Sequence, residues 1–571
     1  MENKEIISRL KQLAKLLELH EANPFKVRGY NSAVFHLEKI DTRLAQLDLA
    51  ELQKLEGVGK GIATAIDEIN KTNESQQLNE LLSKTPEGLI PLLDVKGAGP
   101  KKIRLIWQEL GITDGEALLE ACKRGEIAKL KGFGDKLQEN LKQSLLFTHA
   151  NVGKLHYSKA EELAEGLLAM LKEKLPQALI SLSGELRRKL EVVSLIQVII
   201  GDENPSKVFD QLKNFEALEY NEKISGPFSW RGKLKESATD IEIKLCQKTN
   251  FYNVLFKHTG SDKHLSVLVD EGKNLYQIIS DHQLTNEKEA YDLVKLPFIE
   301  PEMREGTFEF SMAIENKLPE LIKYDDLRGI LHNHTTYSDG KHTLREMAEC
   351  CRDMGYEYLG ISDHSQIAVY ANGLDEDRIL QQHTEIDQLN KEMAPFKIFK
   401  GIESDILYEG QLDYPDDVLK TFDFIVASIH SQLNMDINQA TNRLLTAIAN
   451  PYTTMLGHPT GRLLLKREGY PIDHKTVIDA CAEYGVIIEI NANPWRLDLD
   501  WRWVHYALEK NVMLSINPDA HDKSAYGMMQ YGIHVGRKGG LNKEMTFNAL
   551  SLEKVEEHFN KRKELAAEKI K

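Results

Sequence analysis

Apolar and polar positions divide the chain into regions of different character. The first stretch, MENKEIISRLKQLAKLLELH, places apolar and charged residues at helical spacing and predicts an amphipathic helix. The segment GELRRKLEVVSLIQVII joins a glycine turn and two arginines to an apolar strand. After about residue 325, short apolar strands alternate with helical stretches, as in barrel-type α/β enzymes. The chain has 571 residues, enough for three or four domains, and we predict a multidomain α+β and α/β fold.

Three segments within the first 150 residues repeat one pattern: an apolar residue, a Gly-x-Gly turn, a basic or polar residue and an amphipathic helix. They read LEGVGKGIATAI (55–66), VKGAGPKKIRLI (95–106) and LKGFGDKLQENL (130–141). Two glycines let the chain reverse tightly, and the free N–H groups at the start of the next helix favour a phosphate. Each pair could instead end one helix and begin another, but three copies favour DNA binding.

This repeat resembles the helix-hairpin-helix motif, which binds the DNA backbone without reading sequence. The residues that we expect to contact DNA are Gly57, Gly59, Lys60, Gly97, Gly99, Lys101, Lys102, Gly132, Gly134 and Lys136.

Composition and charge narrow the class of protein. The net charge of −16 argues against a protein that binds a polyanion over its whole surface. Basic and acidic residues balance over residues 1–150, so the acidic excess falls on the rest of the chain, where it suits metal binding. No stretch approaches the ~20 apolar residues of a membrane span, no secretory segment is present, and the five cysteines form no CxxC pair. We therefore expect a cytoplasmic monomer with reduced thiols and no membrane partner.

Residues 1 to about 315 resemble a family X DNA polymerase. In that family the palm carries a G-S-x-R-R turn, a D-x-D strand and a third aspartate on a neighbouring strand, and the three carboxylates hold two Mg²⁺ ions. Further segments that resemble the family are HTGSDKH (258–264), at the nucleotide pocket, and LPFIEPEMREG (296–306), in the thumb. Alignment on the glycine and the paired arginines assigns the palm positions to Gly184, Arg187, Arg188, Leu195, Gln197 and Asp240.

The metal ligands of this expected palm are degenerate. Leu195 cannot bind Mg²⁺, Gln197 offers one neutral oxygen, and Asp240 alone should not hold two ions. Glu185 replaces the family's serine and would repel a nucleotide triphosphate. Our hypothesis is a palm without Mg²⁺ or templated synthesis, kept as a DNA-binding or structural platform. The alternative is a misalignment in which Glu191, Asp202 or Glu203 serves, but none of these forms a D-x-D strand.

Almost every predicted strand of the C-terminal region ends in a residue that can bind a metal. The candidates are His332, His334, Asp339, His364, Glu403, His430, His458, Asp519 and His521. Residues i and i+2 of a strand share a face, so His332 and His334 can bind one ion, as can Asp519 and His521. This set exceeds the needs of a single ion and predicts two or three divalent ions. Imidazole and carboxylate without thiolate suit Zn²⁺, Mn²⁺ or Fe²⁺ and disfavour Ca²⁺.

The pattern resembles the polymerase-and-histidinol-phosphatase (PHP) family, which has a distorted seven-stranded β/α barrel and a trinuclear metal centre. The resemblance implies one ion held by His332, His334, Glu403 and Asp519, a second by Glu403, His430 and His458, and a third by Asp339, His364 and His521. Such ions activate water as a nucleophile and neutralise phosphate oxygens. Bacterial family X polymerases often carry this domain at the C-terminus.

Four nearby residues are candidates for substrate contact. Arg462 could clamp a phosphate oxygen, or it could be a surface residue of the basic loop RLLLKREG. Asn491 and Asn493 could orient the substrate, and Trp495 could stack on a base or belong to the core.

The expected organisation follows the chain. Residues 1–80 form a helical DNA-binding domain with the first hairpin, 81–150 carry further hairpins, 151–315 form palm and thumb, 316–327 a linker and 328–571 the PHP barrel. We predict a metal-dependent 3′→5′ exonuclease for DNA repair that acts on gapped, nicked or 3′-recessed DNA, with abasic sites as a further candidate target. The alternatives are a bifunctional polymerase and exonuclease, a phosphatase of the histidinol-phosphate type, and a scaffold. The missing D-x-D argues against the polymerase. The DNA-binding front half argues against the phosphatase, and the full set of metal ligands argues against the scaffold.

Overall fold

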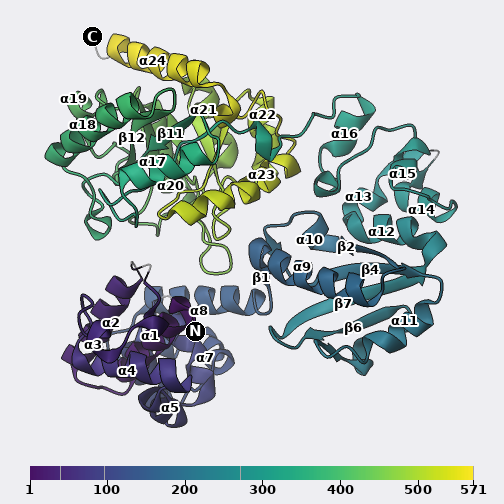
Figure 1. The fold of residues 1–571 in the computed structure, drawn as a ribbon, viewed down its shortest axis with the longest axis horizontal. Coiled ribbons are helices and arrows are strands. Elements are labelled where there is room, and N and C mark those ends of the chain that lie inside the picture. Colours follow the sequence, from purple (N-terminus) through teal and green to yellow (C-terminus); the bar gives the residue numbers. More distant parts are fainter. Residues whose placement is uncertain (39, 41, 96, 271, 570–571) are drawn as a thin grey trace. The chain divides into compact units, whose positions relative to one another are not determined.

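The computed structural model describes residues 1–38, 40, 42–95, 97–270 and 272–569. The chain forms two compact units, Met1–Val152 and Gly153–Lys571 (Figure 1). Among the described residues, no helix combines the length and the apolar character that a membrane crossing requires.

The first unit is helical. Its α-helices are α1 (Asn3–Leu19), α2 (Pro24–Leu37), α3 (Leu49–Leu52), α4 (Lys60–Thr72), α5 (Gln76–Ser83), α6 (Pro100–Leu110), α7 (Gly115–Lys123) and α8 (Asp135–Ala150). Each long helix turns an apolar stripe inward, and α1 alone buries Ile6, Leu10 and Leu13 in the shared core.

The repeated glycines begin three of these helices. The first glycine of each pair has a left-handed backbone, with φ of +74° at Gly57, +91° at Gly97 and +85° at Gly132. The second glycine is the N-cap of the helix that follows, at α4, α6 and α8. The turn is therefore tight, and the first N–H groups of each helix lie next to a residue without a side chain.

The second unit begins with a five-stranded sheet in the predicted palm, which we call the palm-like sheet. Its strand order is β2 (Leu179–Ser183), β4 (Ile196–Asp202), β7 (Thr239–Gln247), β6 (Ser229–Leu234) and β5 (Leu218–Tyr220). Helices α9 (Tyr157–Lys174) and α11 (Pro205–Leu212) pack their apolar residues on one face. On the opposite face, α12 (Phe251–Thr259) covers only the end at Ile199 and Cys246. The four short helices that follow are α13 (Asp262–Ser266), α14 (Leu275–Ser280), α15 (Lys288–Asp292) and α16 (Glu309–Ile314).

The rest of the second unit is a seven-stranded, all-parallel barrel. The strands are β10 (Gly329–Ile330), β11 (Tyr358–Ile361), β12 (Lys397–Asp405), β13 (Phe424–Ser428), β14 (Met455–Leu456), β15 (Ile487–Asn491) and β16 (Leu514–Asn517), paired in chain order. A parallel bridge between Asn333 and Ala520 joins the segments that follow the first and last strands. The helices outside the strands are α17 (Leu344–Asp353), α18 (Glu376–Glu392), α19 (Asp416–Leu419), α20 (Ile437–Ala449), α21 (His474–Tyr484), α22 (Trp501–Glu509) and α23 (Met529–Lys538), and α24 (Leu552–Lys569) ends the chain.

Side chains of the barrel strands alternate between two apolar layers. Ile398, Ile425 and Ile488 pack against the outer helices, whereas Phe399 and Phe424 fill the interior together with Phe559 of α24 and other residues. Toward the carboxyl ends of the strands, the inward positions become polar. One amino-terminal layer therefore closes the barrel, and the other end is left for a polar site. These elements confirm the predicted fold class, and the boundaries within the second unit stay predictions.

Buried ion pairs join the palm-like sheet, the short helices and the barrel. Lys538, at the end of α23, is only 1% exposed, and its ammonium group contacts the carbonyl oxygen of Arg188 (2.9 Å) and the carboxylate of Glu305. Burial lowers the pKa of Lys538 to about 8 despite the opposing effect of Glu305, so the group is charged at neutral pH. Within the predicted linker 316–327, Ile322 is fully buried and its N–H donates to Leu541 (2.9 Å), so this segment packs against the barrel.

We expect Lys538→Met to destabilise the second unit by about 2–3 kcal/mol, because it leaves the Arg188 carbonyl without its buried donor and removes one partner of Glu305. Thermal and urea unfolding of the full chain measure this change. Lys543→Met is the matched control, since Lys543 pairs with Asp326 at the surface with 46% of its side chain exposed. Equal stability of the two variants would contradict the structural role of Lys538.

Candidate metal centre

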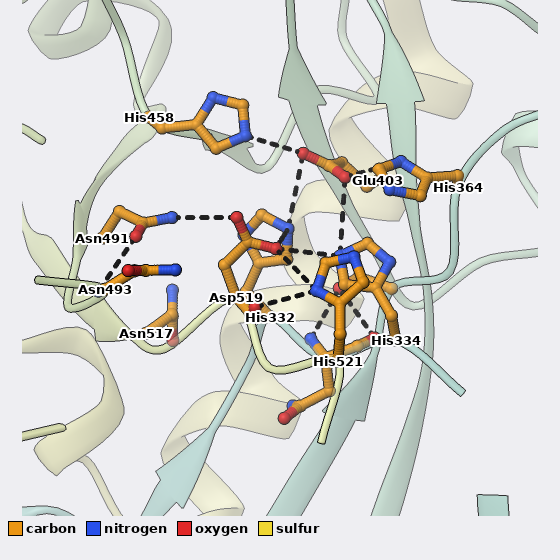
Figure 2. A network of polar contacts seen from close by, with 12 residues as sticks. His332, His334, His364, Glu403, His458, Asn491, Asn493, Asn517, Asp519 and His521 are labelled. Atoms are coloured by element: carbon orange, nitrogen blue, oxygen red, sulfur yellow. Dashed lines mark hydrogen bonds and ion pairs between the residues drawn. The ribbon is translucent and has the colours of Figure 1, made fainter. Parts of the chain in front are cut away.

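The carboxyl ends of the barrel strands bring the predicted ligands into one cluster (Figure 2). Glu403 follows Phe399 and Gly401 on the inward side of β12 and is fully buried. His332 and His334 follow β10, and Asp519 follows β16 in a left-handed conformation (φ +52°). The buried strands fix these backbones on two sides, which allows the unfavourable conformation at Asp519 to persist.

Three groups of ligand atoms each lie within 4.8 Å of one another. They are His332, His334 and Asp519; His364, Glu403 and His430; and His334, Asp339, His364 and His521. His458 lies beside them, with its Nε2 atom 3.0 Å from Glu403 Oε1. All nine candidates therefore meet, but the groups differ from those that the PHP resemblance implied. His334 and His364 belong to two groups each, and Glu403 groups with His364 and His430.

The atoms of this cluster fit divalent cations better than hydrogen bonds. His364 Nδ1 and Glu403 Oε2 are 2.9 Å apart, yet neither atom has a hydrogen-bond partner in the described part of the chain. The Nε2 atom of His332 is likewise buried without one. Buried polar atoms rarely lack partners, and lone pairs that converge at close range without bonding to each other are typical of ligands around a shared ion.

The charges of the cluster reinforce one another. Burial disfavours protonation of His430, but Glu403 and Asp405 outweigh this effect and raise its pKa to about 10. Burial and the nearby rings of His521 and His364 lower the pKa of His334 to about 3. Burial opposes ionisation of Glu403, but the surrounding histidines hold the pKa of its carboxyl well below the usual range. The acids are thus ionised, as ligands must be, and a bound ion would take the place of imidazole protons.

Glu489 is a further candidate for the site and was not among the residues predicted from the sequence. It is fully buried on β15, 2.6 Å from His332 Nδ1, and it accepts the backbone N–H of His458 (2.8 Å). A carboxylate on the second nitrogen fixes the tautomer and orientation of a metal-binding histidine. The signal in the sequence was a single acid inside the otherwise apolar strand IIEIN.

Arg462 does not reach the ligands. Its guanidinium donates to the carbonyl oxygens of Arg496 (2.8 Å) and Leu497 and pairs with Asp500. These contacts engage the group in holding a loop, which leaves it unavailable as the expected phosphate clamp. Arg496 on that loop lies closer, with its Nε atom 3.6 Å from Asp519 Oδ2.

The two candidate asparagines also contact the protein itself. Asn491 Nδ2 donates to Asp519 Oδ2 (3.3 Å), and Asn491 Oδ1 accepts the backbone N–H of Asn493 (3.1 Å). Asn493 Oδ1 in turn accepts the N–H of Trp495 (3.0 Å). This chain of bonds orients a ligand and a loop, and Trp495 itself stays half exposed.

The palm-like sheet contains a different cluster. Gln197 on β4 lies opposite Glu242 on β7 and donates to its carboxylate (2.8 Å). Glu242 is also contacted by Arg231 (2.7 Å) and Lys244 (3.1 Å). Burial opposes ionisation of Glu242, but these donors lower its pKa to about 2. The protein's own cations thus neutralise the acid next to Gln197.

Asp240, the residue aligned with the third aspartate, lies farther along the same strand. It is exposed and pairs with Lys233 (3.6 Å), and Leu195 precedes β4. Glu242 was not among the residues predicted from the sequence, although the alternation in TDIEIKL places Asp240, Glu242 and Lys244 on one face.

The turn at Gly184 connects parts of the protein to one another. Arg187 pairs with Glu287 (2.9 Å) and Arg188 with Glu305 (2.9 Å), both beyond α12. The turn could either contact DNA or hold the shape of the protein, and these ion pairs favour a structural role.

In the first unit, Lys60, Lys101 and Lys136 are exposed at the starts of their helices, where a phosphate could be bound.

Comparison with known proteins decides the family. Residues 1–75 match the model described as helix-hairpin-helix domain, 89–145 match the SAM-like helix-hairpin-helix tandem, and 331–493 match the PHP domain. The chain is 36% identical to the DNA polymerase/3'-5' exonuclease PolX of Bacillus subtilis (strain 168) over 97% of its own length and 99% of that protein. The chain belongs to the family X DNA polymerases of bacteria.

Two further relatives are similar to a shorter part of the chain. A probable phosphatase of Thermoanaerobacter sp. (strain X514) is 27% identical over 41% of this family X chain and 94% of the phosphatase. A probable phosphatase of Acetivibrio thermocellus is 26% identical over 41% of this chain and 95% of that phosphatase. The expected resemblances to family X polymerases and to the PHP family are confirmed, and helix-hairpin-helix domains indicate DNA binding. The site residues stay predictions.

We expect Glu489→Gln to weaken metal binding by about 10–100-fold, because the neutral amide no longer fixes the His332 ring as a metal ligand. Titration of the metal-free protein with Mn²⁺ or Zn²⁺, followed by calorimetry, measures the affinity. Glu483→Gln, at an exposed position of α21, is the control. Unchanged affinity in Glu489→Gln would show that His332 needs no such support.

Proposed function

We propose that this chain is a metal-dependent 3′→5′ exonuclease that trims DNA ends in repair, with the barrel as the hydrolytic site. The observation that carries the proposal is the convergence of nine imidazole and carboxylate candidates, several of whose buried atoms, among them His332 Nε2 and Glu403 Oε2, lack hydrogen-bond partners in the described part of the chain. The B. subtilis relative is named a polymerase and 3'-5' exonuclease, which supports DNA as the substrate. Two or three ions fit the site, and its nitrogen and oxygen ligands favour Mn²⁺ or Zn²⁺.

The chemistry divides between the ions and the chain. Bound divalent ions supply an activated water and neutralise the phosphate. Arg496 is placed to bind a phosphate oxygen, because its guanidinium lies at the edge of the cluster beside Asp519. Arg462 is a positioning residue, because its side chain donates to the backbone carbonyl of Arg496 and so holds the Arg496 loop. Glu489 orients His332, and Asn491 orients Asp519.

The first unit suits the delivery of DNA. Three hairpin turns with glycine N-caps present helix amino termini and exposed lysines, which bind phosphates without sequence preference. We propose gapped, nicked or 3′-recessed DNA as the substrate and a monomer as the active form. Phosphate contacts of this kind weaken as the salt concentration rises.

Templated synthesis is the second candidate function, because the relative's printed name includes it. The palm-like sheet argues against it. Gln197 and Glu242 bond to each other, and Arg231 and Lys244 already neutralise the acid, so little negative charge is left to attract Mg²⁺. A small-molecule phosphatase is the third candidate. Such an enzyme would not need the helix-hairpin-helix motifs of the first unit to bind its substrate.

We expect the full chain with Mn²⁺ to shorten a 3′-recessed oligonucleotide and His332→Ala to abolish that loss, because the variant removes a ligand from the centre of the cluster. Electrophoresis of 5′-labelled DNA measures the products. His282→Ala, outside the barrel, is the control and should retain activity. Equal trimming by His332→Ala and the unaltered protein would place the nuclease elsewhere, and turnover of phosphomonoesters alone would favour a phosphatase.

We expect no extension of a gapped primer with all four nucleotides and Mg²⁺ or Mn²⁺, since Arg231 and Lys244 neutralise Glu242 and Asp240 pairs with Lys233. The measurement uses His332→Ala, so that exonuclease activity cannot hide synthesis. Adding Gln197→Asp to this variant should not restore extension, because Arg231 and Lys244 remain. Templated extension by His332→Ala alone would refute the proposal that synthesis is lost.

A further inference from the structure

Trp495 is a large apolar side chain left at the surface beside the metal centre. It is 50% exposed, and it precedes Arg496, whose guanidinium reaches Asp519. Both residues lie just beyond the segment 331–493 that matches the PHP domain. Exposed aromatic rings next to a polar site are typical of binding surfaces.

The predicted palm and thumb, residues 151–315, which we call the palm-like part, supply the support for this ring. His156 belongs to the short strand β1 (Leu155–His156), and its ring centroid lies 4.1 Å from that of Trp495 at an angle of 46°. His156 Nε2 lies 2.9 Å from the carbonyl oxygen of Leu464, and Leu464 donates its own N–H to the carbonyl of Trp495 (2.6 Å). The indole therefore packs on His156 while half of its surface stays exposed.

The backbone around Trp495 is fixed as well. Arg462 holds the carbonyl of Arg496 and pairs with Asp500. Asp500 also pairs with Arg502 (2.9 Å), and Arg502 pairs with Glu191 of the palm-like part (2.8 Å). A ring with so little freedom loses little conformational entropy when a ligand packs on it.

We propose that Trp495, supported by His156, is a stacking site for the base of the 3′-terminal nucleotide at the cleaved linkage of DNA. The proposal rests on the exonuclease function given above. Consecutive residues offer a base-sized ring and a phosphate-binding guanidinium, the two groups that one nucleotide requires. Stacking of a base on an aromatic side chain contributes about 1–3 kcal/mol and tolerates any sequence.

Fluorescence of 2-aminopurine reports the stacking without hydrolysis. The full chain binds an oligonucleotide that carries 2-aminopurine at its 3′ terminus and a phosphorothioate at the last linkage, first with Zn²⁺ and then with EDTA. We expect quenching on binding that Trp495→Ala removes and Trp495→Phe largely keeps, while the anisotropy of a 5′ label shows unchanged overall binding. His156→Ala should reduce the quenching. Phe228→Ala removes another exposed aromatic ring (62% exposed) and should leave it unchanged.

Hydrolysis of two matched oligonucleotides gives the second measurement. One has a normal 3′-terminal nucleotide, and the other ends in a tetrahydrofuran residue that lacks a base. Trp495→Ala should lower kcat/KM about 10-fold for the normal end, within the range of stacking energies, and leave the end without a base unchanged. Arg496→Ala should slow both, because it acts on the phosphate.

The outcomes separate the two proposals. Quenching that survives in Trp495→Ala, or an equal loss of kcat/KM on both substrates, would overturn the stacking site, since the second result indicates a displaced Arg496 loop. If the unaltered chain cleaves neither oligonucleotide, the exonuclease proposal fails, and the fluorescence measurement still decides whether Trp495 stacks on a base.

Discussion

The buried carboxylate of Glu403 is the constraint on which the barrel depends. It is fully shielded from water, and the rings of His332, His364, His430 and His458 lie within 3.4 Å of its oxygens. An isolated charge at such a position is very unfavourable, and cations are the partners that the surrounding lone pairs can share. The seven parallel strands make this possible, because their carboxyl ends deliver side chains from distant segments to one point, while Phe399, Phe424 and Phe559 supply the apolar packing at the other end.

The palm-like sheet also buries a carboxylate, but it neutralises the charge with its own side chains. Glu242 is also a buried carboxylate, but Arg231 and Lys244 from its own sheet neutralise it. Because these side chains neutralise Glu242, the sheet does not need metal ions from solution to balance its charge. The adjacent arginines of the turn at Gly184 pair with Glu287 and Glu305. A segment with the outline of a nucleotide-binding turn thereby becomes a connector, which explains how it persists without its metal ligands.

How much the sequence could predict depended on the range of the interactions. The Gly-x-Gly turns and the histidines at i and i+2 are local patterns, and the structure places both as local geometry requires. Residues whose roles depend on partners far along the chain were harder to assign. Arg462 looked suited to a phosphate because nothing in its neighbourhood reveals Asp500, and Arg496 was overlooked although it stands beside Trp495. Glu242 and Glu489 were visible as single acids in apolar strands, but only strand pairing shows that each faces a polar partner.

The contact between His156 and Trp495 implies that the hydrolytic site extends beyond the barrel. Its candidate metal ligands all come from the barrel, whereas the support for the exposed indole and for the loop of Arg496 comes from His156 and Glu191. A barrel alone would keep the chemistry and lose the fixed ring, so it would treat a phosphate without regard to the base attached to it. The two proposals together give the palm-like part a role in selecting the substrate, because it positions the ring that we propose to stack on a nucleotide base.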